Sequence, residues 1–372
     1  MPSTSVFQLT MLVLMAVGFG QDDQWINTKE PPPGHVLTFR QALYHVVHGL
    51  LLRISFPQWV WGSQASRDTL AVAGIAGRGW LGKQAQHTAI AFSELAGYLR
   101  ELLRDELANA PDEQGRGTLF KSLVEALVSE NEEIPHGKND LFGNMFIFLV
   151  AGYETTAHAL AYTLGLLALD DLEQQRLYDH IKDVLQDREP DVPKLNRVLA
   201  VFFEALRLYP AGSEQTRYVE KDTIFSVPTA LSDPDMADLK TSSEKDVSRT
   251  DVFVPRGSEV IVDMVGLHHN PRYWPDPYAF KPDRFLDPNW PRDAFAPFFI
   301  GPRSCMGRRF SEVEAIAIIT LIIRKYKVSI DSTRFPDIPG ESKLQRRERV
   351  LESAMSIVIR PCSPIPLIFT RR

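Results

Sequence analysis

A single cysteine, Cys305, stands in a short loop directly before a long apolar run. Residues 298–307 read Phe-Phe-Ile-Gly-Pro-Arg-Ser-Cys-Met-Gly, and the glycines Gly301 and Gly307 allow backbone angles and a close approach to a flat ligand that a Cβ would resist. The apolar run predicts a buried helix, whose N-terminus carries unpaired N–H groups and the positive end of the macrodipole. Both favour a thiolate at Cys305, and Arg303 adds a positive charge nearby. A thiolate presented in this way suits haem iron as a soft ligand.

A second chemical feature interrupts the apolar stretch between residues 142 and 169. The sequence Ala-Gly-Tyr-Glu-Thr-Thr begins at Ala151 and offers an acid and an alcohol, Glu154 and Thr155, in neighbouring positions. Because Ala151 and Gly152 are small, we expect the helix to widen here and a ligand to approach its backbone. The Thr155 hydroxyl would then turn away from the carbonyl four residues earlier and towards that ligand. Taken alone, the motif favours a helix kink with a solvated glutamate.

Glu204 and Arg207 form the third feature, because residues three apart share a helix face and can pair. On a surface such a pair is common and contributes little to stability. A further arginine, Arg284, lies in the segment Phe-Lys-Pro-Asp-Arg-Phe shortly before the cysteine loop. On these residues alone, a surface ion pair is the simpler interpretation.

The three features occur in an order that resembles the signature motifs of the cytochrome P450 family. The cysteine loop matches Phe-x-x-Gly-x-Arg-x-Cys-x-Gly, the loop with which that family binds haem. The resemblance implies that Cys305 is the axial ligand of the iron of heme b. The other loop residues that it places around the cofactor are Phe298, Gly301, Arg303 and Gly307.

The resemblance also gives roles to the helix motif. Glu154 and Thr155 correspond to the family's acid–alcohol pair, which relays protons during oxygen activation. Ala151 and Gly152 correspond to the residues that line the oxygen groove. The order of this motif relative to Cys305 favours these roles over a kink with a solvated glutamate.

Arginines complete the site that the resemblance implies. Arginine's planar fork suits a carboxylate, so Arg303 and Arg217 are candidates for binding the haem propionates, although a solvent-facing Arg217 is equally consistent with the sequence. The family also has a buried network of one glutamate and two arginines, which braces the cysteine loop and is structural, not catalytic. The residues that match it by position are Glu204, Arg207 and Arg284.

Composition is typical of an intracellular globular enzyme. The 372 residues are 44% hydrophobic and 24% charged, and the net charge is −6. No dense basic cluster is present, so nucleic acid is not an expected partner. The two cysteines, Cys305 and Cys362, favour a reduced compartment, although a disulfide between them stays open at this stage.

Periodicity predicts a helix-rich chain with strands late in the sequence. The expected fold class is mainly α with small β-sheets, in a cytochrome P450 fold. We expect one domain over residues 1–372, with substrate-roof helices in 1–136, a haem-binding core in 137–372 and a flexible insertion at 232–250. The expected helices are 37–54, 90–108, 142–169, 173–186 and 310–326. Strands are expected around residue 224 and at 252–265, 328–330, 354–359 and 367–370.

The beginning of the chain departs from the family pattern. Typical eukaryotic members start with a membrane anchor and carry a Trp-x-x-x-Arg pair, whereas no tryptophan here has an arginine four residues later. Residues 8–20 resemble a helix from the middle of the fold, so we expect a chain that lacks the N-terminal third. A signal peptide is the alternative, but residues 1–5 carry no Lys or Arg. As a membrane span the apolar segment is too short.

The resemblance implies a haem-dependent monooxygenase that inserts one atom of O2 into an apolar small molecule. The wording Trp-Pro-Arg-Asp-Ala-Phe at residues 290–295 looks most like filamentous-fungal members, which suggests secondary metabolism. The implied electron donor is NADPH–cytochrome P450 reductase, and the implied location is the cytosolic face of the endoplasmic reticulum membrane. A truncated non-catalytic homologue or haem-binding remnant is the alternative. A haem protein that catalyses isomerisation or uses peroxide is a third possibility.

Overall fold

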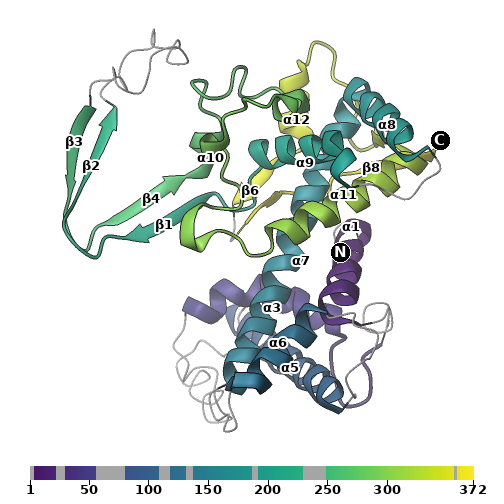
Figure 1. Cartoon of the computed structure of the whole chain (residues 1–372). Coiled ribbons are helices and arrows are strands. Elements are labelled where there is room, and N and C mark those ends of the chain that lie inside the picture. The colour runs from purple at the N-terminus through teal and green to yellow at the C-terminus, as the bar shows by residue number, and fades with distance from the viewer. Residues whose placement is uncertain are drawn as a thin grey trace. The chain divides into compact units, whose positions relative to one another are not determined.

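The computed structural model describes residues 4–21, 30–55, 80–108, 118–130, 137–186, 192–228, 249–355 and 358–372. The chain divides into two compact units, Ser3–Ala157 and His158–Arg372. The boundary falls inside one long helix, α7 (Gly137–Leu169), which contributes residues to both units (Figure 1). Within the described part of the chain, no helix combines the length and the apolar character that a membrane crossing requires.

The first unit is helical. Its described elements are α1 (Thr4–Val13), the π-helical turn η1 (Leu14–Gly18), α3 (Phe39–Ser55), α5 (Trp80–Ala108), α6 (Leu119–Glu130) and the first part of α7. The predicted helices over 37–54 and 90–108 are therefore present, the second beginning ten residues earlier than expected.

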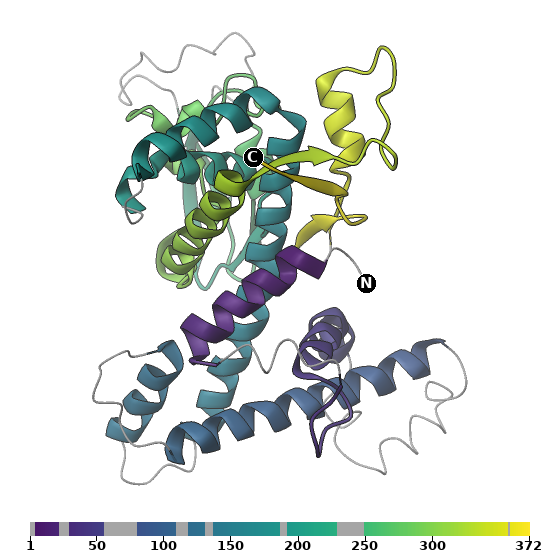
Figure 2. The ribbon, with the colours of Figure 1, turned by 90° about the vertical axis from the view of Figure 1, so that its right-hand side faces the viewer.

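Helices α3 and α5 pack closely in the first unit (Figure 2). Gly49 permits this approach, because a Cβ there would lie 2.5 Å from the Thr88 hydroxyl oxygen. The Phe39 ring meets the Tyr98 ring edge-on, with centroids 5.5 Å apart. The loop before α3 is tied to α5 as well, because the two ring nitrogens of His35 lie 3.1 and 3.2 Å from carboxylate oxygens of Glu94 and Glu101.

In the residues that the structure describes, the second unit combines helices with four small antiparallel sheets. Its longer described helices, apart from the end of α7, are α8 (Asp171–Leu185), α9 (Asn196–Leu208), α11 (Arg308–Lys325) and α12 (Lys343–Val350), and its shorter ones are α10 (Met264–His268), η3 (Val192–Lys194), η6 (Pro282–Leu286), η7 (Arg292–Ala294) and η8 (Gly301–Arg303). The strand pairs are β1 (Glu214–Tyr218) with β4 (Glu259–Asp263), β2 (Thr223–Pro228) with β3 (Arg249–Val254), β5 (Tyr326–Ile330) with β8 (Leu367–Arg371), and β6 (Ser353–Met355) with β7 (Ile359–Pro361). The expected fold class, mainly α with small sheets, is confirmed.

Three sequence expectations differ from the structure in this unit. The single strand expected over 354–359 is replaced by β6 and β7, which pair antiparallel with Met355 opposite Ile359. The strand expected over 252–265 is interrupted and ends at Asp263, because the Asp263 carboxylate accepts a hydrogen bond from the Gly266 N–H at 2.8 Å and caps α10. The predicted insertion at 232–250 also extends too far, since β3 begins at Arg249. Residues 232–248 of that insertion lie outside the described residues.

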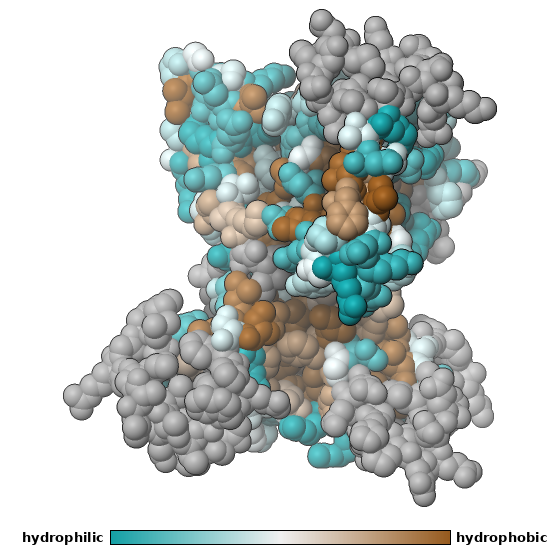
Figure 3. All heavy atoms as spheres, turned by 90° about the vertical axis from the view of Figure 1, so that its left-hand side faces the viewer, coloured by the Kyte–Doolittle hydropathy of each residue, from teal (hydrophilic) through white to brown (hydrophobic). Residues whose placement is uncertain are grey.

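The β2–β3 hairpin is apolar yet exposed. Ile224 pairs with Phe253, Phe225 pairs with Val252, and all four side chains are exposed. Figure 3 views the molecule from the side of this hairpin and shows apolar side chains lying among hydrophilic ones.

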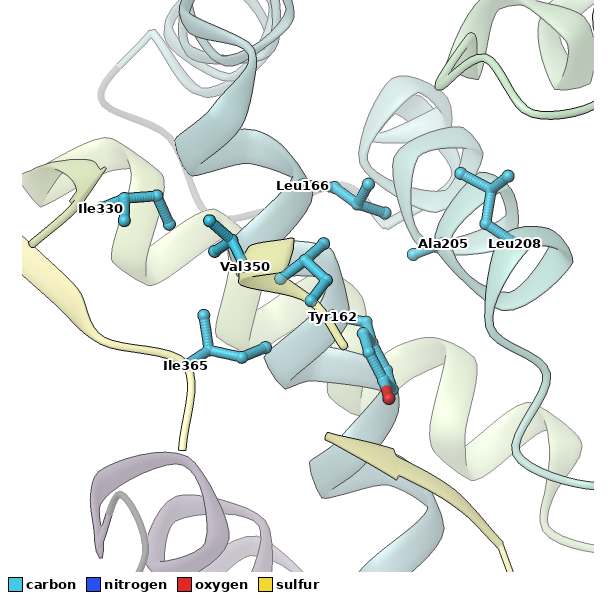
Figure 4. Close-up of a cluster of buried hydrophobic side chains, with 8 residues drawn as sticks. Tyr162, Leu166, Ala205, Leu208, Ile330, Val350 and Ile365 are labelled. Carbon is cyan, nitrogen blue, oxygen red and sulfur yellow. The ribbon is translucent and has the colours of Figure 1, made fainter. Parts of the chain in front are cut away.

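A hydrophobic cluster forms the core of the second unit (Figure 4). It joins the end of α7 to α9 and to segments near the end of the chain. Gly165 on α7 makes this packing possible, because a Cβ there would lie 2.6 Å from a Leu351 methyl carbon. The buried members are Tyr162, Leu166, Ala205, Leu208, Ile330, Val350, Leu351 and Ile365.

Gln174 connects α8 to the neighbouring elements through its buried amide. Its Nε2 donates to the carbonyls of Leu167 and Val328 at 2.9 and 2.8 Å, and its Oε1 accepts from the Val328 N–H at 2.9 Å. The side chain thereby completes the backbone hydrogen bonding of β5, which buried polar groups require.

Candidate functional site

From Val198 to Leu208 helix α9 is buried almost all round, so the two charges in this part can be accommodated only as a pair. Glu204 and Arg207 both have 0% exposure, and Arg207 Nε and Nη2 donate to the two Glu204 carboxylate oxygens at 2.7 and 2.9 Å. The pair predicted from the spacing is therefore present, but it lies in the core of the second unit and not on its surface.

Arg207 also uses its remaining donors. Nη1 donates to the His268 and Pro277 carbonyls at 2.8 and 2.7 Å, and Nη2 donates to the Ala279 carbonyl at 3.2 Å. All five guanidinium N–H groups thus have acceptors. The guanidinium carbon lies 5.3 Å from the centre of the Trp274 ring. One side chain therefore fixes α10 and the loop that follows it against α9.

Glu204 extends this network to the second predicted arginine. Its Oε1 accepts from the Lys281 backbone N–H at 2.8 Å and from Arg284 Nε at 3.3 Å. Arg284 Nη2 in turn donates to the Asp276 carbonyl at 2.8 Å, and burial lowers the pKa of its guanidinium. The structure therefore brings Glu204, Arg207 and Arg284 together.

Aromatic side chains hold the segment that leads to the cysteine loop. Phe295, which follows η7, is buried at their centre. Its ring centroid lies between 4.8 and 6.4 Å from those of Phe203, Trp274, Phe285, Trp290 and His268. These contacts fix the approach to the loop about ten residues before Cys305.

The cysteine loop itself lies at the surface of the second unit. Residues 301–309, including Cys305 and Arg303, are exposed. The Cys305 N–H donates to the Phe298 carbonyl at 2.7 Å, and α11 begins three residues later at Arg308. Cys305 is a free thiol, as is Cys362, so the disulfide left open by the sequence is not formed.

Two residues of the loop adopt left-handed backbone angles. Gly301 has φ +78°, a conformation that favours glycine and that the sequence predicts there. The second residue is Phe299, with φ +60°. This conformation directs the Phe299 ring to Gly212, where a Cβ would lie 2.9 Å from its Cζ atom. Gly307 has φ −81°, which any residue adopts, so the expectation of special backbone angles is wrong there. A Cβ at Gly307 would lie 3.8 Å from the Cys305 sulfur.

Positive charge surrounds the loop and the start of α11. Arg308 and Arg309 pair with the buried Glu312 at 2.9 and 3.5 Å, and the Arg308 guanidinium lies 5.5 Å from the centre of the half-buried Phe298 ring. Arg303 is exposed beside Cys305. A cation and a thiol are thus presented to solvent together.

The helix motif, in the first unit, differs from its expectation in two respects. Thr155 Oγ1 donates to the Ala151 carbonyl at 2.7 Å, and α7 is α-helical throughout, without the predicted widening. A threonine in a regular helix finds this acceptor one turn back, which explains why the hydroxyl does not turn away. Gly152 faces Leu14 of η1, whose methyl carbon would lie 3.3 Å from a Cβ.

The neighbourhood of Glu154 is partly buried. Tyr153 beside it is buried, and burial followed by the charge of Glu154 raises the pKa of the Tyr153 hydroxyl to about 12. Glu154 and Thr155 are themselves half-buried.

Arg217 lies on β1, opposite Val260 of β4. Its Nη1 donates to the Thr216 carbonyl at 2.8 Å, and the residue is half-buried. The sequence left open whether Arg217 binds an anion or faces solvent, and this local contact is compatible with both.

Comparison with known proteins bears directly on these motifs. A family model described as cytochrome P450 matches residues 73–226 and 236–351. The chain belongs to the cytochrome P450 family. Cytochrome P450 monooxygenase 124 of Postia placenta is 36% identical over 375 residues, which cover 98% of this chain and 64% of that protein. Cytochrome P450 monooxygenase prx9 of Penicillium rubens is 24% identical over 414 residues, covering 100% of this chain and 65% of that protein.

Animal members of the family match a shorter region. Cytochrome P450 3A41 of Mus musculus is 30% identical over 198 residues, which cover 50% of this chain and 34% of that protein. This P450 chain therefore spans 64% and 65% of the length of the two fungal relatives. The resemblance to the family and to fungal members, expected from the motifs, is confirmed.

The residues of the cysteine loop fit the haem-thiolate cofactor of a cytochrome P450. Cys305 supplies one accessible soft ligand, and Arg303 supplies a cation suited to a carboxylate. Among the described residues, apart from Gly301 and its two chain neighbours, no atom lies within 4 Å of a Cβ added at Gly301, so the loop leaves room for a flat group.

Sequence reasoning overlooked two buried residues of this P450 chain. The sequence patterns give no role to His268, whose carbonyl accepts from Arg207, and they include Glu314 only as one position of the apolar helix after Cys305. Glu314 is 5% exposed, its Oε1 has no hydrogen-bond partner among the described residues, and burial raises its pKa to about 8. A charged residue inside a run that predicts a buried helix was the available signal.

Proposed function

We propose that the protein is a haem-thiolate monooxygenase that inserts one oxygen atom of O2 into an apolar small-molecule substrate. The observation that carries the proposal is an exposed Cys305 at the start of α11, in a loop whose approach is fixed by the aromatic cluster around Phe295. Bound haem, for which heme b is the proposed form, supplies the oxygen chemistry. The protein's part is to bind, orient and deliver protons.

Several residues of this chain are proposed to hold the cofactor. Cys305 would hold the haem iron through its thiolate, and electron donation from such a ligand would favour O–O cleavage. Arg303, with Arg217 as the second candidate, binds the propionates. The network of Glu204, Arg207 and Arg284 is proposed to brace the loop and so to keep the ligand in place. The residues proposed to flank the cofactor are Phe298, Gly301, Gly307, Ala151 and Gly152.

Glu154 and Thr155 are proposed to deliver protons. The Thr155 hydroxyl donates its hydrogen to Ala151, and this leaves lone pairs on Oγ1 that can accept a proton from a neighbouring donor. A rotation about the Cα–Cβ bond would release the hydroxyl from the helix for the next transfer. Glu154 is the adjacent ionisable group and the proposed source of the proton.

The partners and the location are part of the proposal. NADPH–cytochrome P450 reductase is the proposed electron donor, and the cytosolic face of the endoplasmic reticulum membrane is the proposed location. Fungal relatives named as monooxygenases support a role in fungal secondary metabolism. The helices within residues 1–136 are proposed to form the roof over the substrate.

The reduced, carbon-monoxide-bound absorption spectrum of the haem-loaded protein tests the ligand. We expect a red-shifted thiolate Soret band that Cys305→Ala abolishes. Cys362→Ala is the matched control, because Cys362 is also an exposed free thiol, and it should leave the band unchanged. Retention of the band in Cys305→Ala, or a wild-type protein that takes up no haem, would contradict the proposal.

Thr155→Val tests proton delivery, because valine keeps the shape and removes the hydroxyl. We expect product formed per NADPH consumed to fall by about tenfold or more, within the range of general acid–base effects. Thr163→Val is the control, since the Thr163 hydroxyl makes the same contact with the carbonyl four residues earlier, at 2.7 Å. Equal coupling in the wild type and in Thr155→Val would remove Thr155 from the mechanism.

A further inference from the structure

His268 ends α10 and is completely buried in the second unit, with 0% exposure. Two different parts of the unit contact it. Its backbone carbonyl accepts from Arg207 Nη1 at 2.8 Å, and its ring nitrogen Nε2 accepts from the Ala296 backbone N–H at 2.9 Å. His268 therefore lies between the charged network on α9 and the segment that leads to Cys305.

The Ala296 contact defines the chemical state of the ring. A backbone N–H can only donate, so Nε2 must present a lone pair and the imidazole hydrogen must sit on Nδ1. Burial, followed by the charge of Arg207, lowers the pKa of His268 to about 3, which agrees with a neutral ring. Nδ1 has no hydrogen-bond partner among the described residues. The ring thus makes one hydrogen bond, and that bond is to the backbone of Ala296.

A hydrogen bond at Ala296 holds the chain close to the cysteine loop. It is 2% exposed and lies two residues before Phe298, whose carbonyl holds the Cys305 N–H at 2.7 Å. The adjacent Phe295 ring stacks on the His268 ring, with centroids 5.6 Å apart and an interplanar angle of 27°. Direct contacts therefore run from Arg207 through His268 and Ala296 to the loop that carries the thiol.

We propose that His268 is a positioning residue for the Cys305 ligand: its neutral ring fixes Ala296, and through Ala296 the loop that holds the sulfur in place. This inference rests on the proposed haem-thiolate function. A residue that merely filled space would be replaceable by any side chain of similar bulk. A positioning residue requires an acceptor at the place of Nε2.

Three substitutions separate these roles. In His268→Gln the side-chain carbonyl reaches about as far as Nε2 and keeps an acceptor for Ala296. In His268→Asn the side chain is too short for its carbonyl oxygen to reach the Ala296 N–H, and the side chain in His268→Leu has no acceptor. His269→Asn is the matched control, because the neighbouring His269 is half-buried and its Nδ1 lies 3.0 Å from the carbonyl of Val265, in the helix that His269 caps.

The first measurement is amide hydrogen exchange over residues 294–305 in the haem-free protein. Loss of one hydrogen bond should speed exchange at Ala296 by about tenfold in His268→Asn and His268→Leu. His268→Gln should stay near the wild-type rate, and His269→Asn should not change it. If His268→Leu does not fold, the comparison of Gln with Asn decides the matter. Equal rates in those two variants would overturn the proposal.

The second measurement is the share of thiolate-ligated haem in the carbon-monoxide-bound spectrum. We expect His268→Asn to shift haem from the thiolate band to the neutral-thiol band at unchanged haem content, and His268→Gln to reverse the shift. An unchanged band ratio in His268→Asn would overturn the inference. If the wild type lacks a thiolate band, the proposed function fails, whereas amide exchange still decides whether His268 holds Ala296.

Discussion

Arg207 and Arg303 are both arginines of the second unit, yet one is wholly buried and the other is exposed. Arg207 satisfies all five N–H donors within the fold, whereas Arg303 lies beside Cys305 in a loop open to solvent. The buried arginine supports structure and the exposed one is available for chemistry. The buried arginine of the candidate site is therefore bonded within the fold, whereas the exposed one lies in the loop that presents the thiol.

Replacing each arginine tests the difference between the buried and the exposed side chain directly. Arg207→Ala leaves the Glu204 carboxylate buried without its main partner, and we expect the free energy of unfolding to fall by about 3–5 kcal/mol. Arg303→Ala should change it by less than about 0.5 kcal/mol, because the side chain is exposed. Urea unfolding of both variants measures the contrast. Similar losses in the two variants would show that Arg207 does not brace the unit.

Glu314 and Glu312 on α11 are both buried, but among the described residues Glu312 pairs with two arginines and Glu314 Oε1 has no hydrogen-bond partner. Burial raises the pKa of Glu314 from 4.5 to about 8. Between pH 4.5 and about 8 the Glu314 carboxyl is therefore protonated in the folded state and ionised in the unfolded state. The unfolding free energy should therefore fall as pH rises from 4.5 to about 8, by at most about 1.4 kcal/mol per pH unit.

Glu314→Gln should remove this part of the pH dependence, and Glu312→Gln should leave it in place. Denaturant unfolding between pH 5 and 8 provides the measurement. An unchanged slope in Glu314→Gln would show that the carboxyl finds a partner or water in solution.

Substituting the two glycines of the cysteine loop should change the free energy of unfolding least. Alanine at Gly301 must adopt φ +78°, which costs about 1–2 kcal/mol, while alanine at Gly307 keeps φ −81° without strain. We expect Gly301→Ala to lower the unfolding free energy by that amount and Gly307→Ala to change it by less than about 0.5 kcal/mol. Equal losses in thermal or denaturant unfolding would contradict the backbone argument.

Much of the fold could be predicted because its signals are local. The apolar run after the cysteine becomes α11, and the spacing of Glu204 and Arg207 produces a bonded pair. Local signals were also missed: Ser342 and Gln345 form a capping box that begins α12, a helix not predicted from the sequence. The capping of α10 by the Asp263 side chain is a second local signal that the sequence analysis missed.

The candidate site was predictable in its residue types but less so in its orientations. Periodicity gives the face of a helix, not a side-chain rotamer, so it could not show that Thr155 bonds to Ala151. The bond between His268 and Ala296 joins residues 28 positions apart, and it depends on how α10 packs against the segment before the cysteine. The roles of Cys305, Glu154 and Thr155 in catalysis stay predictions.

The core around Tyr162 has a consequence for the order in which the chain can fold during synthesis. Tyr162 and Leu166 pack with Val350, Leu351 and Ile365, which lie about 200 residues further along. At a synthesis rate of about 5–20 residues per second, these partners emerge roughly 10–40 s later. Until then the apolar end of α7 has no native cover from them, so a nascent chain stalled before residue 350 would expose that surface to chaperones and to aggregation.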